Sequence, residues 1–210
     1  MTRILLIRHG QTEWNRQEIF RGRADIPLSD VGNQQSRYLS ESLVGEKISA
    51  IYCSPLNRAY VTAELLALTR GLAVEKVDGL VDISYGEWEG RQHKEVKEHY
   101  PDLYAQWKIA PQHVELPGGE TLAFVSGRAV AALDELANRH QTATIAVISH
   151  RVVNKLILCH ALGLGNDAFW RIRQSTCCLN VLEWERDRAV IGLLNDTCHL
   201  RGLEADTSDF

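Results

Sequence analysis

The chain has 210 residues and a formal net charge of −4, with 45% hydrophobic and 24% charged residues. This length and balance are typical of a soluble globular protein with one sizeable core, so we expect a single domain over residues 1–210. The acidic balance argues against general nucleic-acid binding, and no segment reaches the roughly 20 apolar residues that span a bilayer.

The first half of the chain alternates short apolar runs with amphipathic segments. Three runs predict strands, at residues 3–7, 48–53 and 72–77. A helix is expected over 30–44, with Ser29 placed as its N-cap. A second helix is expected to start at Ser54-Pro55 and to run to about residue 69, with Ser54 as the cap and Pro55 in the first turn.

The second half repeats the alternation after an interruption. Residues 95–108 are predicted to be helical with a break at Pro101, and residues 111–120 form a loop. The elements expected after this loop are a helix over 121–139, a strand over 143–148, a helix over 152–162, and a hairpin of strands 178–184 and 189–194 joined by the charged turn 185–188. A short acidic tail, expected to be frayed, ends the chain.

This order of elements predicts an α/β fold of three layers, α/β/α, with a mostly parallel sheet and an antiparallel edge hairpin. Segment 82–120 departs from the alternation, and we interpret it as a helical, lid-like insertion. The hairpin edge is compatible with a homodimer and equally with an edge buried inside the monomer.

The cysteines and the N-terminus indicate the compartment. The five cysteines are an odd number without a CxxC pair or a metal-ligand spacing, which predicts reduced, mostly buried thiols and no metal site. The N-terminal apolar run of four residues is too short for a secretory signal. We therefore expect a cytoplasmic protein.

Basic side chains follow three of the predicted strands. Arg8 and His9 end the first strand, Arg58 follows the second, and His150 ends the strand at 143–148. Parallel strands present their carboxyl ends at one edge of the sheet, so these groups can converge there. Converging cations need an anion among them, and a phosphate monoester matches guanidinium groups well. The helix N-termini expected after Ser54 and His150 would favour the same anion.

Seven motifs in order along the chain resemble the histidine phosphatase superfamily, also called phosphoglycerate mutase-like. They are RHGQTEWN at 8–15, FRG at 20–22, PLSDVG at 27–32, SPLNRAYVTAE at 54–64, DISYGEWEG at 82–90, PGGET at 117–121 and VISH at 147–150. The resemblance spans almost the whole chain. It implies an enzyme that transfers a phosphoryl group through a phosphohistidine, without a metal or another cofactor.

The resemblance also implies roles for individual residues. His9 corresponds to the nucleophile, and Arg8, Arg58 and His150 correspond to the phosphate pocket. Further phosphate or substrate contacts are implied for Asn15, Arg21 and Gly22.

The family's proton donor is the first acid of an ExxxGxWEG stretch, and this chain has Asp82 at that place. Aspartate is one methylene shorter than glutamate, and its reference pKa is about 0.4 unit lower. We favour Asp82 as the donor. The alternative is that Asp82 is a turn residue and that Glu87 or Glu89 supplies the proton.

Two further positions depart from the family pattern. Arg151 stands where many members have a small residue, and it either reaches the phosphate, as a substrate-binding residue, or faces solvent. Tyr85 is a candidate substrate contact at a place where the metal-independent phosphoserine phosphatases carry a histidine. Trp88 and Trp107 also lie in this region, where aromatic residues more often pack than recognise a substrate.

The short interval between Asp82 and Pro117 favours a phosphatase over a phosphoglycerate mutase, because the mutases carry a longer insertion there. YPDLYAQW at 100–107, PGGE at 117–120 and LNDTCHL at 194–200 look similar to the metal-independent phosphoserine phosphatases. We expect a small phosphorylated metabolite as substrate, such as phosphoserine, α-ribazole phosphate or a sugar phosphate. Neither a nucleic acid nor a membrane is expected as a partner. The alternative from another class is a non-catalytic phosphate-binding relative.

Overall fold

The computed structural model describes residues 1–185 and 188–203. The acidic tail at 204–210 lies outside the described residues, as do the two central residues of the charged turn predicted at 185–188. Among the described residues, no helix is both long enough and apolar enough to cross a membrane.

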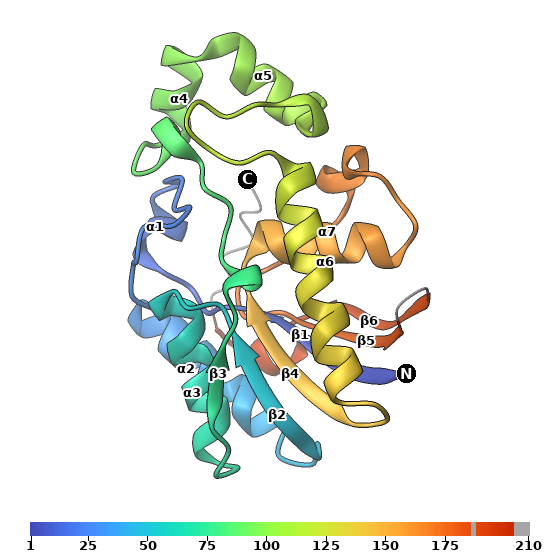
Figure 1. The fold of residues 1–210 in the computed structure, drawn as a ribbon. Helices are drawn as coiled ribbons and strands as arrows, with labels where there is room; N and C mark the ends of the chain where they lie inside the picture. Colours follow the sequence, from blue (N-terminus) through green and yellow to red (C-terminus); the bar gives the residue numbers. More distant parts are fainter. Residues whose placement is uncertain (186–187, 204–210) are drawn as a thin grey trace.

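A six-stranded sheet forms the centre of the molecule (Figure 1), in the order β3-β2-β4-β1-β5-β6. Its strands are β1 (Thr2–Arg8), β2 (Ile48–Cys53), β3 (Val74–Lys76), β4 (Thr144–Ser149), β5 (Leu179–Glu185) and β6 (Arg188–Asp196). Strands β1 to β4 pair in parallel, whereas β5 pairs antiparallel with both β1 and β6. The predicted mostly parallel sheet with an antiparallel edge hairpin is therefore confirmed.

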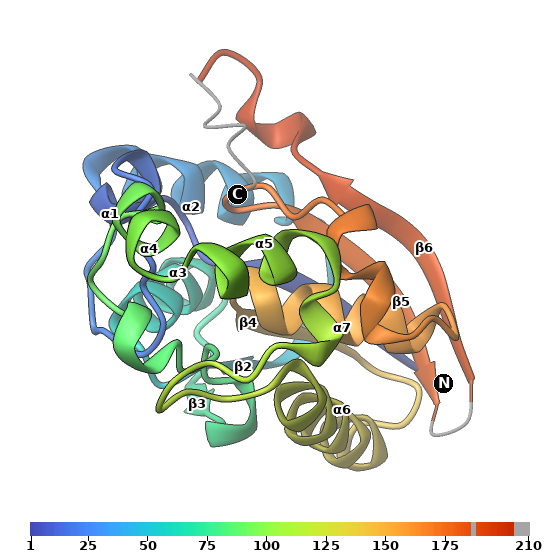
Figure 2. The same ribbon diagram turned by 90° about the horizontal axis from the view of Figure 1, so that it is seen from above.

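Helices cover both faces of the sheet (Figure 2), as the three-layer prediction requires. α2 (Asp30–Ser42) and α3 (Asn57–Leu68) cover one face, and α6 (Leu122–Arg139) and α7 (Arg151–Ala161) cover the other. In β1, Leu5 and Ile7 belong to the core under α2 and α3, while Ile4 and Leu6 belong to the core under α6 and α7. A strand covered on both faces reads as a continuous apolar run, which is why β1 could be predicted.

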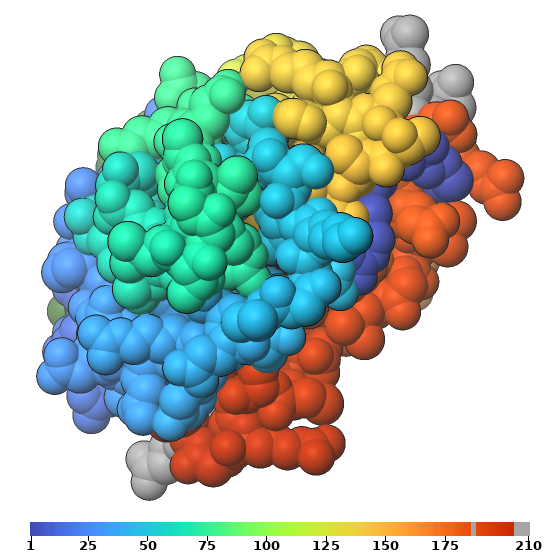
Figure 3. Space-filling model, turned by 90° about the horizontal axis from the view of Figure 1, so that it is seen from below, coloured from blue at the N-terminus to red at the C-terminus, as the bar shows by residue number. Residues whose placement is uncertain are grey.

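The predicted insertion lies above the carboxyl ends of the parallel strands (Figure 1). It contains α4 (His93–His99) and α5 (Pro101–Ile109), and Pro101 separates them as expected. Seen from below (Figure 3), the opposite face is built from the chain's first third, the far end of α6 and the C-terminal hairpin. The remaining short helices are α1 (Glu13–Arg16) and five 3₁₀ turns at Asp78–Leu80, Gly86–Trp88, Pro111–His113, Asn166–Arg171 and Cys198–Leu200.

The start of α3 corrects one expectation. The helix begins at Asn57 with Leu56 as its N-cap residue, so Ser54 does not cap it. Ser54 still continues the ladder of β2, because its backbone N–H donates to the Ile148 carbonyl at 2.9 Å. The cap comes from a distant loop, where an Asp25 carboxylate oxygen accepts the Asn57 N–H at 2.6 Å.

Two smaller predictions hold. Ser29 caps α2 by accepting a hydrogen bond from the Gly32 N–H at 3.1 Å. All five cysteines are free thiols, and four are buried. Cys198 is the exposed one.

The YGEW and PGG motifs contact each other through their backbones. Gly86 has a φ of +56°, and a Cβ there would lie 2.0 Å from the Pro117 carbonyl oxygen. A Cβ at Gly119 would lie 2.6 Å from the Ser84 carbonyl oxygen. The two glycines let the first and last parts of segment 82–120 lie against each other.

We predict that Gly86→Ala lowers the free energy of unfolding by about 2 kcal/mol or more, because the left-handed backbone disfavours alanine and the new Cβ overlaps a backbone carbonyl. Gly127→Ala is the matched control, since a Cβ at this exposed position of α6 meets no atom within 4 Å. It should raise the free energy by about 0.5–1 kcal/mol. Urea unfolding measures the free energy of unfolding of both variants. Equal changes in the two variants would contradict the close backbone contact between Gly86 and Pro117.

Candidate active site

The register of three parallel strands brings the predicted histidines together. Arg8 of β1 pairs with Ser149 of β4, and the His9 N–H donates to the Ser149 carbonyl at 3.0 Å. The imidazole ring centroids of His9 and His150 lie 5.2 Å apart. The hydroxyl of Ser54, which follows β2, lies 2.7 Å from His150 Nε2.

Two fully buried arginines accompany the histidines. Arg58 projects from the first turn of α3, and its guanidinium donates to the carbonyls of Gly22 at 2.7 Å and Ala24 at 2.8 Å. Arg8 donates to the carbonyl oxygen of Gln174. The residues with predicted phosphate-pocket roles therefore meet at one edge of the sheet.

His9 is held in one tautomer and in its neutral form. Its Nδ1 lies 2.6 Å from the Gly10 carbonyl oxygen, which can only accept, so Nδ1 carries the proton and Nε2 keeps its lone pair. Burial holds the pKa of His9 well below its usual range, and the charges of Arg58, Arg8 and Arg21 lower it further. Burial and Arg58 also lower the pKa of His150.

Asp82 lies beside Arg58 and His150. One carboxylate oxygen accepts the Ile83 N–H at 3.0 Å. The other accepts from Arg58 at 3.2 Å and lies 3.6 Å from His150 Nδ1. The side chain of Asp82 is thus buried against the predicted phosphate pocket and is not a solvent-facing turn residue.

The two alternative acids have other partners. A Glu89 carboxylate oxygen accepts the backbone N–H groups of Tyr85 at 3.0 Å and Arg23 at 3.2 Å. The carboxylate of Glu87 accepts from the Tyr100 hydroxyl at 2.6 Å. Glu89 holds a loop and Glu87 holds α4 and α5 against the turn that precedes them.

Arg128 of α6 positions Asp82 and was not foreseen from the sequence. Its guanidinium donates to the carbonyls of Gly79 at 2.9 Å, Val81 at 2.6 Å and Asp82 at 3.2 Å. It also forms an ion pair with Glu120 at 3.1 Å. One side chain therefore fixes the backbone of the turn that carries Asp82.

Most of the predicted substrate contacts line one small cavity. Its walls are formed by Asn15, Glu18, Ile19, Phe20, Arg21, Tyr85, His93 and Arg151. Arg151 is buried and hydrogen-bonds to the Tyr85 hydroxyl, so it does not face solvent. Gly22 contributes only its carbonyl, to Arg58.

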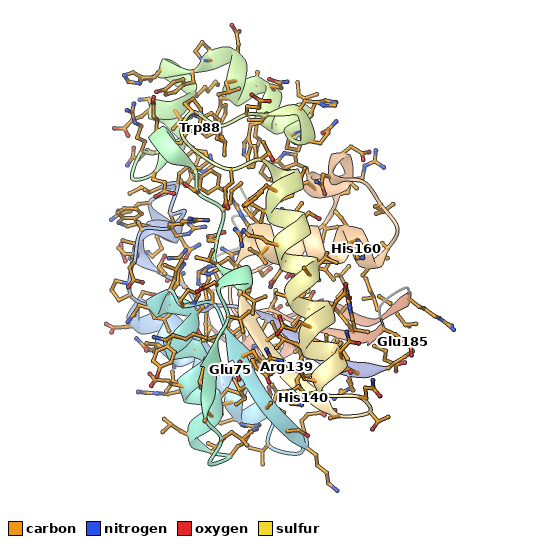
Figure 4. All side chains as sticks on the ribbon, in the orientation of Figure 1. Glu75, Trp88, Arg139, His140, His160 and Glu185 are labelled. Atoms are coloured by element: carbon orange, nitrogen blue, oxygen red, sulfur yellow. The ribbon has the colours of Figure 1, made fainter. Side chains whose placement is uncertain are left out.

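The two tryptophans near this cavity pack and do not line it. Trp88 and Trp107 are buried to 0% and 1% exposure, with their rings edge to face at 6.3 Å. Figure 4 shows Trp88 at the base of α4 and α5. The packing interpretation of these aromatics is therefore the correct one.

Sequence reasoning missed several residues of the site. Ser54 was assigned as a helix cap, and Glu18, His93 and Arg128 were not assigned at all. A serine directly after a predicted strand, level with His9 and His150, was the one available signal. Among the described residues, no group of three or more His, Cys, Asp or Glu side chains is placed to hold a metal ion.

Comparison with known proteins agrees with this geometry. The model of the histidine phosphatase superfamily (branch 1) matches residues 4–197. The chain is 38% identical over 200 residues to phosphoserine phosphatase 1 of Hydrogenobacter thermophilus, covering 95% of each chain. It is 30% identical over 193 residues to the adenosylcobalamin/alpha-ribazole phosphatase of Escherichia coli, covering 92% of this chain and 95% of the relative.

Solved structures give the same result. YhfR of Bacillus stearothermophilus superposes with a TM-score of 0.91 at 27% identity, covering 95% of this chain and 100% of the neighbour. A phosphoserine phosphatase of Entamoeba histolytica, in complex with 3-phosphoglyceric acid, has a TM-score of 0.86 at 26% identity, with coverage of 95% and 100%. The chain therefore belongs to the histidine phosphatase superfamily, branch 1.

Proposed function

We propose that this phosphatase hydrolyses small polar phosphomonoesters through a covalent phosphohistidine on His9. The observation that carries the proposal is the state of His9, a buried neutral imidazole with its Nε2 lone pair available and two buried arginines beside it. Binding alone would not need a nucleophile. This observation favours an enzyme over the phosphate-binding relative.

In the first step, Nε2 of His9 attacks phosphorus in line with the leaving oxygen. The N–P bond forms as the P–O bond to the alcohol breaks, while Arg8, Arg58 and His150 hold the other phosphoryl oxygens. Asp82 gives its proton to the leaving alkoxide. The bound phosphate competes with Asp82 for the Arg58 guanidinium, and this competition frees the Asp82 carboxyl group to face the leaving oxygen.

In the second step, water attacks the phosphohistidine. The Asp82 carboxylate takes one proton from the water, a new P–O bond forms, and the N–P bond breaks to release inorganic phosphate. The carboxylates of Glu87 and Glu89 already accept hydrogen bonds from Tyr100 and from the Tyr85 backbone, which supports Asp82 as this acid and base. No step calls for a metal ion.

The relatives support the substrate class. The names of the related proteins include phosphoserine and alpha-ribazole phosphatases. The cavity beside the phosphate pocket is lined by polar and aromatic groups, which suits a small polar alcohol.

We predict that incubation with p-nitrophenyl phosphate yields turnover and an acid-labile phosphoenzyme, both insensitive to chelator. His9→Ala should abolish the phosphoenzyme and nearly all turnover, since it removes the atom that accepts the phosphoryl group. Quenched radiolabel transfer measures the intermediate. Absence of turnover and of phosphoenzyme in the wild-type protein would contradict the proposal, and loss of activity with chelator would contradict the metal-free mechanism.

We predict that Asp82→Asn lowers the single-turnover rate of an alkyl phosphate by about 10²–10⁴-fold, because the leaving alkoxide receives no proton. A p-nitrophenolate leaving group needs less protonation, so its loss should be smaller. Glu87→Gln is the matched control at an acid outside the pocket and should stay near wild-type. If Asp82→Asn forms and hydrolyses phosphohistidine normally with the alkyl ester, the donor is another residue.

We predict that the wild-type free energy of unfolding decreases as the pH falls from 7.5 to 5.5. The unfolded chain protonates His9 with the ordinary pKa of 6.5, whereas the folded state keeps it neutral, so stability is lost on the acid side. A histidine that stays neutral in the folded state lowers the free energy of unfolding by about 1.4 kcal/mol between pH 7.5 and pH 5.5. His9→Gln should reduce the pH dependence by that amount, as urea titrations of both proteins at both pH values will measure. An unchanged pH dependence in His9→Gln would contradict a neutral His9 in the folded state.

A further inference from the structure

We propose that the cavity beside the phosphate pocket is a second anion subsite, which receives a carboxylate on the leaving alcohol. The inference rests on the proposed phosphomonoesterase function and narrows its substrate to phosphorylated hydroxy or amino acids. Arg151 is the residue that determines this specificity, with Arg21 as its partner.

The cavity adjoins the phosphate pocket without overlapping it. Of the three arginines whose charges act on His9, Arg21 lines the cavity, whereas Arg8 and Arg58 do not. Arg21 connects the two spaces, because the charges of Arg8, Arg151 and Arg58 and the opposite charge of Asp82 all act on it. The charges of Arg151 and Asp82 both act on the Tyr85 hydroxyl. An ester with its phosphate at His9 and its leaving oxygen near Asp82 therefore extends toward Tyr85 and Arg151.

Arg21 brings a positive charge to the cavity, and the charge of Asp82 also acts on it. No ion pair involves Arg21 among the ion pairs of the described residues, although its guanidinium is partly buried. Its Nε has no hydrogen-bond partner in the described part of the chain, and its Nη1 reaches only the Trp14 carbonyl, at 3.5 Å. Burial and the neighbouring arginines lower its pKa to about 9, which still leaves it charged at neutral pH.

Arg151 supplies the second guanidinium at the first residue of α7. It is buried to 6% exposure, in contact with Tyr85. Glu18 also belongs to the lining, but this residue is exposed, on a turn with a φ of +53°. The buried part of the cavity is therefore the cationic part.

The remaining wall adds no charge. His93 stacks on Phe20 with ring centroids 4.0 Å apart, and its Nδ1 lies 3.2 Å from the Tyr104 hydroxyl. Burial, Arg151 and Lys108 lower the pKa of His93 to about 3, so it stays neutral. The positive charge of the cavity thus comes from Arg21 and Arg151.

This arrangement distinguishes acidic from neutral alcohols. A carboxylate matches the guanidinium fork and supplies the acceptors that Arg21 lacks. A neutral sugar or nucleoside places only hydroxyls or rings against the same buried cations. The geometry accordingly favours acidic substrates over neutral phosphate esters.

The test uses two substrate pairs that differ only in the carboxylate. These are 3-phosphoglycerate with glycerol 3-phosphate, and phosphoserine with phosphoethanolamine. The wild-type kcat/KM should favour the carboxylated member of each pair by about 10- to 100-fold. Arg151→Gln should reduce both ratios by about tenfold or more, and Arg151→Lys should restore part of the loss.

Arg139→Gln is the matched control. It also removes one positive charge, but Arg139 lies at the end of α6 that is distant from the cavity (Figure 4). Its two ratios should equal those of the wild type. A wild-type enzyme without a carboxylate preference in either pair overturns the subsite while leaving phosphatase activity intact, and it does so whether or not the Arg151 variants fold. Unchanged ratios in folded Arg151→Gln overturn the role of Arg151. Absence of any turnover, with no phosphoenzyme from p-nitrophenyl phosphate, overturns the proposed function instead.

Discussion

The burial of two guanidinium groups at one edge of the sheet is the constraint on which the site depends. Arg8 and Arg58 have 1% and 0% exposure, and a buried cation is costly unless acceptors surround it. The acceptors come from parts of the chain that are distant in sequence. Arg58 takes the carbonyls of Gly22 and Ala24 and the carboxylate of Asp82, and Arg8 takes the carbonyl of Gln174. Each of these loops is therefore placed by the cation that it solvates.

The antiparallel hairpin serves the same constraint from the other side. Asn180 of β5 is fully buried, and its amide donates to the Leu6 carbonyl of β1 at 3.0 Å. Its carbonyl oxygen accepts from the side chain of Gln174 at 2.8 Å. Through these two bonds, Asn180 fixes the segment whose backbone carbonyl receives Arg8. Strand β5 thus supplies a buried hydrogen-bonding side chain next to the site, in addition to linking β1 to the edge strand β6.

The sequence predicts what depends on local pattern and misses what depends on distant partners. The ends of β1 and β4 could be located because apolar runs stop at Arg8 and His150, and the parallel order then brings those ends together. Ser54 was misassigned because the cap of α3 comes from Asp25, which is 32 residues earlier. Arg128 donates to a carbonyl 46 residues away, at Asp82, and no spacing in the sequence marks such a contact.

Glu120 joins the two ends of the insertion next to Asp82. The backbone of Glu120 donates to the Ser84 carbonyl at 2.9 Å, and its carboxylate accepts the Ser84 N–H at 2.9 Å. Both ends of segment 82–120 are therefore joined at one point. The same carboxylate pairs with Arg128, which belongs to α6 and holds the carbonyl of Asp82. The turn that carries Asp82 is therefore joined both to α6 and to the end of the insertion, whereas α4 and α5 lie beyond this junction. The backbone of the proposed acid is thus held by Arg128 of α6, whereas the backbone of Tyr85 in the cavity wall is held by Glu89 of its own loop.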